Sequence, residues 1–288
     1  MLTHLDHVIV VVSDLGAATK TLAALLGRLP SWRGEHPGHG TANALFRLSN
    51  TYVELLAPSG TGGLADALRA RLEAGGEGLL GLALRTPDAA AFGAALRDRG
   101  IAVGDPQAGE GRDAASGATR RWRTVVLPSA ATRGLLLFGI EHEGGDDGLA
   151  PAPLLGPATA SVSGLDHVVI VSSDPEASRR LYGEVLGLRL ALDRVFEERR
   201  LRLLFFRVGG VTVEIALPLG ANEEEPDRFM GLSFQVPDAD AARSRLAAEG
   251  FDVSKVRAGM KLGTRVCSVR GRPLGVDTLV IEPVKRPA

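Results

Sequence analysis

The chain repeats itself at a constant offset. Residues 5–10 read Leu-Asp-His-Val-Ile-Val, and residues 165–170, which lie 160 positions later, read Leu-Asp-His-Val-Val-Ile. The offset persists to residues 52–54 and 212–214, so each copy holds a histidine followed 47 positions later by a glutamate. A fainter repeat relates residues 82–88 to residues 232–238. Such a duplication predicts a fold built from repeated units.

The pattern inside each repeat predicts one strand, one helix and then further strands. Segments 7–12 and 167–172 are rich in Val and Ile, which favour strands. Asp14 and Asp174 begin helical segments that end at Gly27 and Gly187. Further helices are predicted at 88–99 and 238–249, and further strands at 44–48, 52–57, 135–141, 202–208, 211–217 and 278–282. We therefore predict an α+β fold of four βαβββ units, paired into domains 1–142 and 164–288 and joined by a Gly-, Ala- and Pro-rich linker at 143–163.

Composition narrows the class of protein. The 288 residues suffice for two hydrophobic cores, and a net charge of −1 without long charged runs disfavours a nucleic-acid surface or a polybasic membrane anchor. Apolar runs are too short to cross a bilayer, and the N-terminus lacks a secretion signal. Cys267 is the only cysteine, which excludes an internal disulfide and a cysteine-cluster metal site. We expect a cytoplasmic monomer or homodimer whose partner is a small molecule, with neither nucleic acid nor membrane as a partner.

The repeats place metal-capable side chains at equivalent strand positions. The opening strands carry a histidine and the closing strands carry glutamates: His7, Glu54 and Glu141 in the first domain, and His167, Glu214 and Glu282 in the second. An imidazole and two carboxylates can bind a divalent metal and leave positions open for water or substrate. A core histidine and solvated glutamates would give the same pattern without any site. A carboxylate in a buried cleft, however, needs a metal, a cation or a proton.

These motifs resemble a known superfamily. Paired units with Leu-Asp-His-Val at residues 5–8 and Val-Glu-Leu or Val-Glu-Ile at 53–55 and 213–215 are similar to the vicinal oxygen chelate proteins. That group includes glyoxalase I, methylmalonyl-CoA epimerase, extradiol dioxygenases and bleomycin-resistance proteins. The resemblance covers almost the whole chain outside the linker, and residues 35–43 resemble its glyoxalase-like subgroup. It implies two glyoxalase-type domains, each with curled mixed sheets around a cleft.

The resemblance also implies roles for the polar residues. The cleft ligands to a metal would be His7, Glu54 and Glu141 in one domain and His167, Glu214 and Glu282 in the other, and one of the four glutamates would move a proton as the catalytic group. The metal would be a divalent Zn, Ni, Co, Mn or Fe ion, with a metal-free protein as the alternative. In the superfamily, the opening strand of the second unit in each domain supplies a further ligand position, which is commonly a histidine. That position is Gly81 in the first domain and Gly231 in the second. That departure counts against an extradiol dioxygenase, whose iron needs two histidines and a carboxylate.

We therefore expect a divalent-metal-dependent lyase or isomerase of glyoxalase type. It would act on a small carbonyl or hydroxy-acid substrate through a metal-stabilised enolate. The alternative is a metal-free small-molecule-binding protein of the bleomycin-resistance type. Candidate substrate-binding residues are His36, His39 and Asn43, from the segment before the strand at 44–48, with Arg47 and Arg207 as clamps for an anionic group or as outward ion-pair partners.

Overall fold

The computed structural model describes residues 2–145, 148–222 and 224–284. Its elements follow the predicted βαβββ order four times. The first unit is β1 (Leu5–Val11), α1 (Leu15–Leu26), β2 (Trp32–His36), β3 (Thr41–Arg47) and β4 (Tyr52–Pro58). The second is β5 (Gly78–Arg85), α3 (Ala89–Asp98), β6 (Gln107–Asp113), β7 (Thr119–Val126) and β8 (Leu136–His142), and it is preceded by an additional helix, α2 (Gly63–Gly75).

The second half repeats this order. The third unit is β9 (Gly164–Val171), α4 (Pro175–Ser178) with the π-helical stretch η2 (Arg179–Val185), β10 (Arg189–Phe196), β11 (Leu201–Val208) and β12 (Val211–Pro218). The fourth is β13 (Arg228–Gln235), α5 (Ala239–Ala248), β14 (Arg257–Ala258), β15 (Arg265–Val269) and β16 (Asp277–Glu282). Short 3-10 turns are η1 (Ala158–Ala160), η3 (Glu197–Arg199) and η4 (Pro273–Gly275). The predicted α+β fold of four paired units is confirmed.

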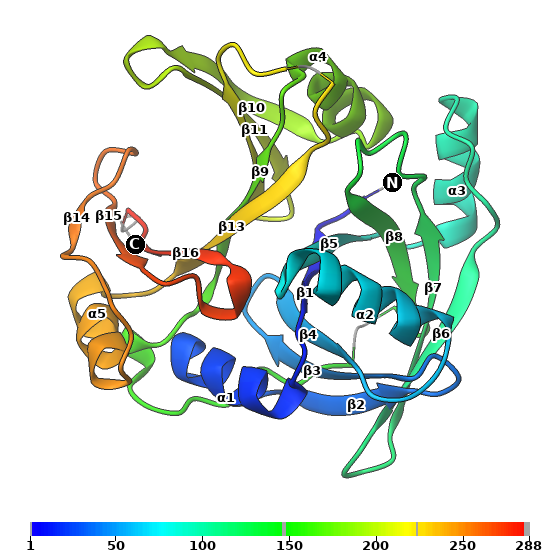
Figure 1. Ribbon diagram of the computed structural model, residues 1–288, viewed down its shortest axis with the longest axis horizontal. Helices are drawn as coiled ribbons and strands as arrows, with labels where there is room; N and C mark the ends of the chain where they lie inside the picture. Colours follow the sequence, from blue (N-terminus) through cyan, green and yellow to red (C-terminus); the bar gives the residue numbers. More distant parts are fainter. Residues whose placement is uncertain (1, 146–147, 223, 285–288) are drawn as a thin grey trace.

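The two domains differ in whether their sheet closes. The first sheet runs β1-β4-β3-β2-β6-β7-β8-β5 and forms a closed barrel, whereas the second runs β10-β11-β12-β9-β13-β16-β15-β14 and stays open. The barrel closes where Gly34 and Glu35 of β2 pair with Asp113 and Arg112 of β6. In Figure 1 the β10–β11 and β14–β15 ends of the second sheet stand well apart. Only the first domain therefore encloses its interior on all sides.

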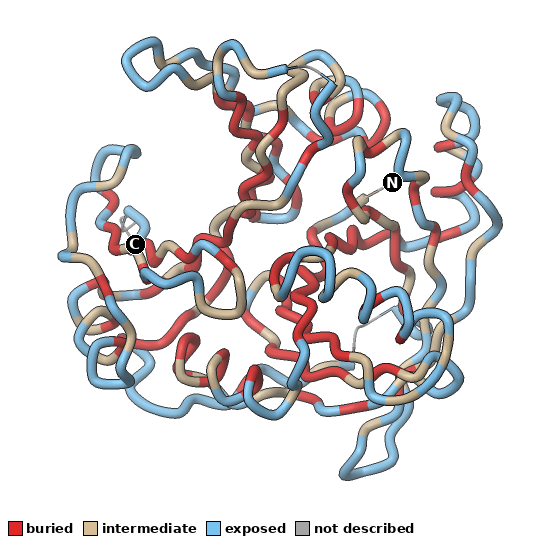
Figure 2. The backbone as a smooth tube through the Cα atoms, viewed as in Figure 1, coloured by how far each residue is buried: buried red, intermediate tan, exposed pale blue. Residues whose placement is uncertain are grey.

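Alternation along β1 separates a cavity face from a core face. Successive side chains of a strand point to opposite sides of the sheet. Val8 and Val10 belong to the main hydrophobic core, whereas His7 and Ile9 line the interior of the barrel. The main core continues from the first domain into the second, and the buried segments of Figure 2 follow the strands of both sheets. The position of a residue in its strand thus decides whether it can belong to a site.

Helix α2 closes one end of the barrel. It packs against β4, and its Leu68 forms an apolar cluster with Ile9, Val11 and Leu56 of the barrel interior. The repeat does not predict this helix, because the described residues between β12 and β13 form no counterpart. The extra helix supplies the first domain with an apolar cover that the second domain lacks.

Arg245 of α5 joins the two domains. Its guanidinium donates hydrogen bonds to the carbonyl oxygens of Ala24, Leu25 and Ala160. Ala24 and Leu25 lie in the last turn of α1, which has no basic residue of its own. Unsatisfied carbonyls and the helix dipole make that end electronegative, so a cation from the other domain stabilises it. No helix within the described ranges is long and apolar enough to cross a membrane.

Arg245→Ala should weaken the domain junction. The substitution removes three charge-assisted hydrogen bonds, which contribute about 2 kcal/mol in total once solvation is considered. Urea unfolding should show this loss of free energy of unfolding. Arg270→Ala is the matched control, because its exposed pair with Asp252 should contribute under about 1 kcal/mol. Equal losses for the two variants would contradict a special role of Arg245.

Candidate functional site

The barrel of the first domain holds a cavity of about 260 Å³. Its apolar wall comes from six strands and α2 and includes Ile9, Leu45, Leu56, Leu64, Leu80, Trp122, Leu136, Phe138 and Ile140. Its polar side chains are His7, His36, Asn43, Tyr52, Glu54, Arg120, Thr124 and His142. A mostly apolar cavity with a few convergent polar groups is the usual form of a small-molecule site.

His7 and Glu54 meet at the polar end of this cavity. His7 Nε2 lies 3.3 Å from Glu54 Oε2, and the two residues are only 3% and 7% exposed. They come from neighbouring parallel strands, β1 and β4, on which alternation aims both inward. The ring of Tyr52 stacks on the His7 ring with centroids 4.5 Å apart. The first domain therefore brings the repeated histidine and glutamate together, as the sequence predicts.

Behind His7, the carboxylate of Asp6 anchors three positively polarised groups. His7 Nδ1 lies 2.7 Å from Asp6 Oδ1, while His142 Nε2 and Arg85 Nη1 each lie 3.1 Å from Asp6 Oδ2. Burial alone would raise the pKa of Asp6, but the hydrogen bonds from His142 and His7 outweigh burial and hold that pKa well below its ordinary value. Asp6 stays charged and fixes the orientation of the His7 ring.

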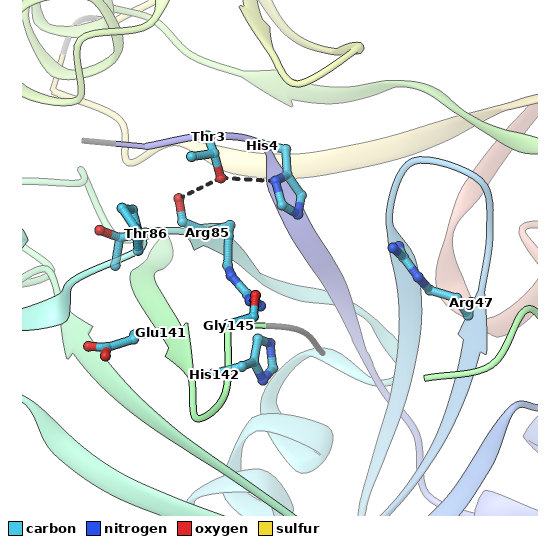
Figure 3. Close-up of a pocket in the computed structure, with 9 residues that line it drawn as sticks. Thr3, His4, Arg47, Arg85, Thr86, Glu141, His142 and Gly145 are labelled. Atoms are coloured by element: carbon cyan, nitrogen blue, oxygen red, sulfur yellow. Dashed lines mark hydrogen bonds between the residues drawn. The ribbon is translucent and has the colours of Figure 1, made fainter. Parts of the chain in front are cut away.

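On its outer side this network borders a second hollow of about 290 Å³, drawn in Figure 3. Arg85 and His142 point toward each other there, and Arg85 also donates to the carbonyl of Gly145. His142 lines both hollows. Burial lowers the pKa of His142, although its bond to Asp6 opposes this. Asp6 and its partners thus form the wall between the cavity and the outer hollow.

Asn43 connects Glu54 to His36. Asn43 Nδ2 donates to Glu54 Oε1 over 2.8 Å and lies 3.2 Å from His36 Nε2, while His36 Nδ1 lies 2.8 Å from the Thr41 hydroxyl. Burial lowers the pKa of His36, so its imidazole is neutral near pH 7. Of the predicted substrate-binding residues, His36 and Asn43 line the cavity.

The expectation that Glu141 would join His7 and Glu54 is wrong in its geometry. Phe138, Ile140 and His142 of β8 face the cavity, so alternation turns Glu141 to the other side of the sheet. There its carboxylate accepts a hydrogen bond from the backbone N–H of Ala89 at the start of α3. A carboxylate at a helix N-terminus complements the helix dipole. The inward residue at this strand end is His142.

Glu282 repeats this arrangement in the second domain. Its carboxylate accepts from the N–H of Ala239 at the start of α5 and from Arg265. The predicted convergence of Glu282 with His167 and Glu214 is therefore also absent. Both glutamates serve the helix that follows the opening strand of their own unit.

Gly81 and Gly231 occupy close approaches between parallel strands. A Cβ on Gly81 would lie 3.0 Å from the carbonyl oxygen of Leu136, and one on Gly231 would lie 2.4 Å from that of Asp277. The distance at Gly231 is shorter than real Cβ atoms show, and the distance at Gly81 is tighter than nine in ten real Cβ contacts. A histidine at Gly231 would require the two strands to move apart, and one at Gly81 would require Leu136 to give way, so close packing favours glycine at both positions.

The second domain has the equivalent pair, His167 and Glu214, but different residues surround it. His167 Nε2 lies 3.7 Å from Glu214 Oε2 and is hydrogen-bonded to the Ser233 hydroxyl at 2.7 Å, where the first domain has Ala83. Asp166 holds His167 Nδ1 and accepts from Gln235, which replaces Arg85. Burial raises the pKa of Glu214. Strand register puts Leu203 at the position of Asn43.

The other predicted substrate contacts lie away from the cavity. His39 is exposed in the β2–β3 turn, and Arg47 borders the outer hollow instead. Arg207 is exposed and donates to the Thr212 hydroxyl. The site residues that the sequence predictions missed include Asp6, Tyr52, Arg85, Arg120 and His142. Asp6 was detectable, because it recurs beside the repeated histidine, and His142 follows from alternation with Phe138 and Ile140.

The donor set does not fit a metal held by three protein side chains. Within residues 2–145, 148–222 and 224–284, no group of three or more His, Cys, Asp or Glu side chains is arranged to hold a metal ion. Of the predicted ligands in each domain, only the histidine and one glutamate come together, because Glu141 and Glu282 cap helices.

Fold and site together define a protein of the glyoxalase, bleomycin-resistance and dioxygenase class. A family model described as "Glyoxalase-like domain" matches residues 5–186, which is more than half of the chain. A second, described as "Glyoxalase/Bleomycin resistance protein/Dioxygenase superfamily", matches residues 166–267. The chain belongs to the glyoxalase-like family, as the resemblance of its motifs implies. None of the curated proteins matches it.

Two solved structures align with almost the whole of this chain, and a third aligns with less than half of it. A variant of 4-hydroxymandelate synthase from Streptomyces coelicolor aligns over 100% of this chain and 94% of its own, with a TM-score of 0.70 and 14% identity. A hypothetical protein from Staphylococcus aureus aligns over 96% and 98%, with a TM-score of 0.64 and 12% identity. Methylmalonyl-CoA epimerase from Mycobacterium tuberculosis is 24% identical over 45% of this chain and 94% of its own, with a TM-score of 0.38. At these identities, the first two likenesses show the fold alone.

Asp6→Asn should destabilise the protein in a pH-dependent way. Loss of the buried charge leaves Arg85 without its carboxylate, and we expect a loss of about 3 kcal/mol in urea unfolding at pH 7. Because the folded pKa of Asp6 is depressed, its contribution is complete above the unfolded value of about 3.9 and is lost as the pH falls through the folded value. The difference in free energy of unfolding between wild type and variant should therefore be constant above about pH 5 and should narrow progressively as the pH falls below about 4.

Asp166→Asn is the matched control, since Asp166 is half-buried and is held by the neutral Gln235 rather than by an arginine. Asp166→Asn should lower the free energy of unfolding at pH 7 clearly less than Asp6→Asn does. A loss as large as that of Asp6→Asn, or a gap that does not change with pH, would contradict the central role of the Asp6 charge.

Proposed function

We propose that the first domain is the working site and that the protein is an enzyme of glyoxalase type. It would bind a small oxygen-bearing substrate and transfer a proton at a carbon next to a carbonyl group, as an isomerase or a lyase does. The observation that carries this proposal is the buried pair of His7 and Glu54, which lines the cavity of the barrel. Catalytic acids and bases are commonly set in such sheltered positions.

The chain's own groups suffice for the proton transfer. Glu54 would take the proton from the substrate carbon, and His7 Nε2 lies 3.3 Å from Glu54 Oε2. Because the Asp6 carboxylate accepts the Nδ1 proton of His7, His7 would act in its doubly protonated form, in which Nε2–H donates a hydrogen bond to the developing enolate oxygen. Glu54 would then return the proton to the same carbon or to its neighbour, so the protein ends the cycle unchanged. Asp6 would hold the His7 ring with Nε2 toward the cavity. The mostly apolar wall lowers the polarity around the pair, which strengthens both interactions.

The differences between the domains support this choice of site. His36, Asn43 and Tyr52 surround the pair in the first domain, where α2 and the closed barrel shelter it. In the second domain the Ser233 hydroxyl already engages His167 Nε2, and the sheet is open. We assign the second domain a structural role.

A metal-free binding protein is the second candidate. It is favoured by the bonds that already join Glu54, Asn43 and His36 to one another, since groups satisfied in this way can hold a ligand without reacting with it. The two candidates differ in one measurable property. Only an enzyme that moves a proton would exchange a carbon-bound hydrogen of its ligand with solvent.

Glu54→Gln should abolish proton exchange. General acid–base groups contribute about 10² to 10⁴ in rate, so incorporation of deuterium from D₂O into a panel of small 2-oxo and 2-hydroxy acids should fall by about that factor. NMR spectroscopy of the panel measures the rate directly. Glu214→Gln, the equivalent change in the second domain, should leave the rate within about two-fold. No exchange by the wild type, with binding retained, would favour the binding protein instead.

Removal of metals should leave this activity intact. Because only the histidine and one glutamate of the predicted ligands come together in each domain, and no group of three donors among the described residues is arranged to hold a metal ion, protein purified without a histidine tag should contain well under one equivalent of any divalent metal by elemental analysis. Dialysis against a chelator should not change the exchange rate. Stoichiometric metal together with activity lost to chelation and restored by one ion would overturn the metal-free mechanism.

A further inference from the structure

The carboxylate and the imidazole beside it fix the orientation of the Asn43 amide. A carboxylate only accepts hydrogen bonds, so the atom that lies 2.8 Å from Glu54 Oε1 must be the amide nitrogen. With its Nδ1 proton donated to the Thr41 hydroxyl, neutral His36 presents the Nε2 lone pair to that same nitrogen at 3.2 Å. Both N–H groups of Asn43 are thereby used.

The amide oxygen of Asn43 is a hydrogen-bond acceptor without a donor in the described part of the chain. Asn43 is 4% exposed and lines the cavity, and its Oδ1 atom is buried with no hydrogen-bond partner among the described residues. Buried polar atoms in proteins are nearly always paired, so an unpaired one in a cavity wall indicates a ligand group. The fold does not require an amide here, because the second domain has Leu203 at the equivalent strand position.

We propose that Asn43 Oδ1 accepts a hydrogen bond from a hydroxyl group of the substrate and so selects a hydroxylated substrate. The inference rests on the proposed function for its choice of cavity. The wall carries the Arg120 guanidinium as well as the Glu54 carboxylate, so it offers an ammonium group no excess negative charge, and we assign the neutral hydroxyl group as the donor. The remaining wall is apolar and the volume is about 260 Å³, which suits a short hydrocarbon chain with the hydroxyl next to a carbonyl or carboxyl group.

Calorimetric titration of the full chain with matched probes tests this assignment. The probes are 2-hydroxyhexanoate, hexanoate and 2-aminohexanoate, which differ only at the second carbon. Wild type should bind the hydroxy acid about 10- to 100-fold more tightly than hexanoate, because hexanoate leaves the buried oxygen unpaired. Asn43→Leu, which copies the second domain, should reduce that preference to about one while leaving the affinity for hexanoate similar.

The ratio of the wild-type affinities for 2-hydroxyhexanoate and hexanoate tests the role of Asn43 even if the Asn43→Leu variant does not fold. Equal binding of hydroxyhexanoate and hexanoate, tighter binding of the amino acid, no binding of any probe, or a preference that survives Asn43→Leu would each overturn the assignment. A hydroxyl preference without deuterium exchange would preserve this inference and reject the proposed enzyme activity. Deuterium exchange without a preference for the hydroxy acid would support the proposed enzyme activity and reject the role of Asn43.

Discussion

The buried carboxylate of Asp6 is the constraint on which the site depends. Moving a charge out of water is costly, and here the cost is offset by hydrogen bonds from His7, His142 and Arg85. These partners come from β1, β5 and β8, so one carboxylate fixes the relative positions of three strands at one end of the barrel. The same bonds set the ring of His7 with Nε2 toward Glu54. Stability of the barrel and geometry of the site therefore share one interaction.

The two repeated domains share one constellation of residues and differ in what surrounds it. Both keep the aspartate, the histidine and the glutamate in the same relative positions. In the first domain, closure of the sheet through β2 and β6 and the cover provided by α2 enclose the pair. In the second, the sheet stays open and Ser233 binds the histidine. Because the closed sheet and α2 cover the pair in the first domain, we place the proposed chemistry there.

Much of the fold could be predicted because its information is local and is repeated. Val- and Ile-rich strands, aspartate caps and glycine ends recur at fixed offsets, and together they identify the units. The residues of the site were harder to predict than the fold. His7 and Glu54 were predicted together and do meet, whereas Glu141 was predicted to join them and caps α3 instead. A one-residue difference in a strand reverses the direction of a side chain, so His142 lies at the position where Glu141 was expected.

The sequence by itself determined the number of units, their internal order and which residues are duplicated, because these follow from hydrophobic periodicity and turn chemistry along the chain. Only the tertiary structure decided which of the duplicated residues face a common interior. Closure of the first sheet, the insertion of α2 and the pairing of Asp6 with Arg85 and His142 join segments far apart in the chain. Contacts of that kind depend on the three-dimensional register of the strands, which no local pattern records.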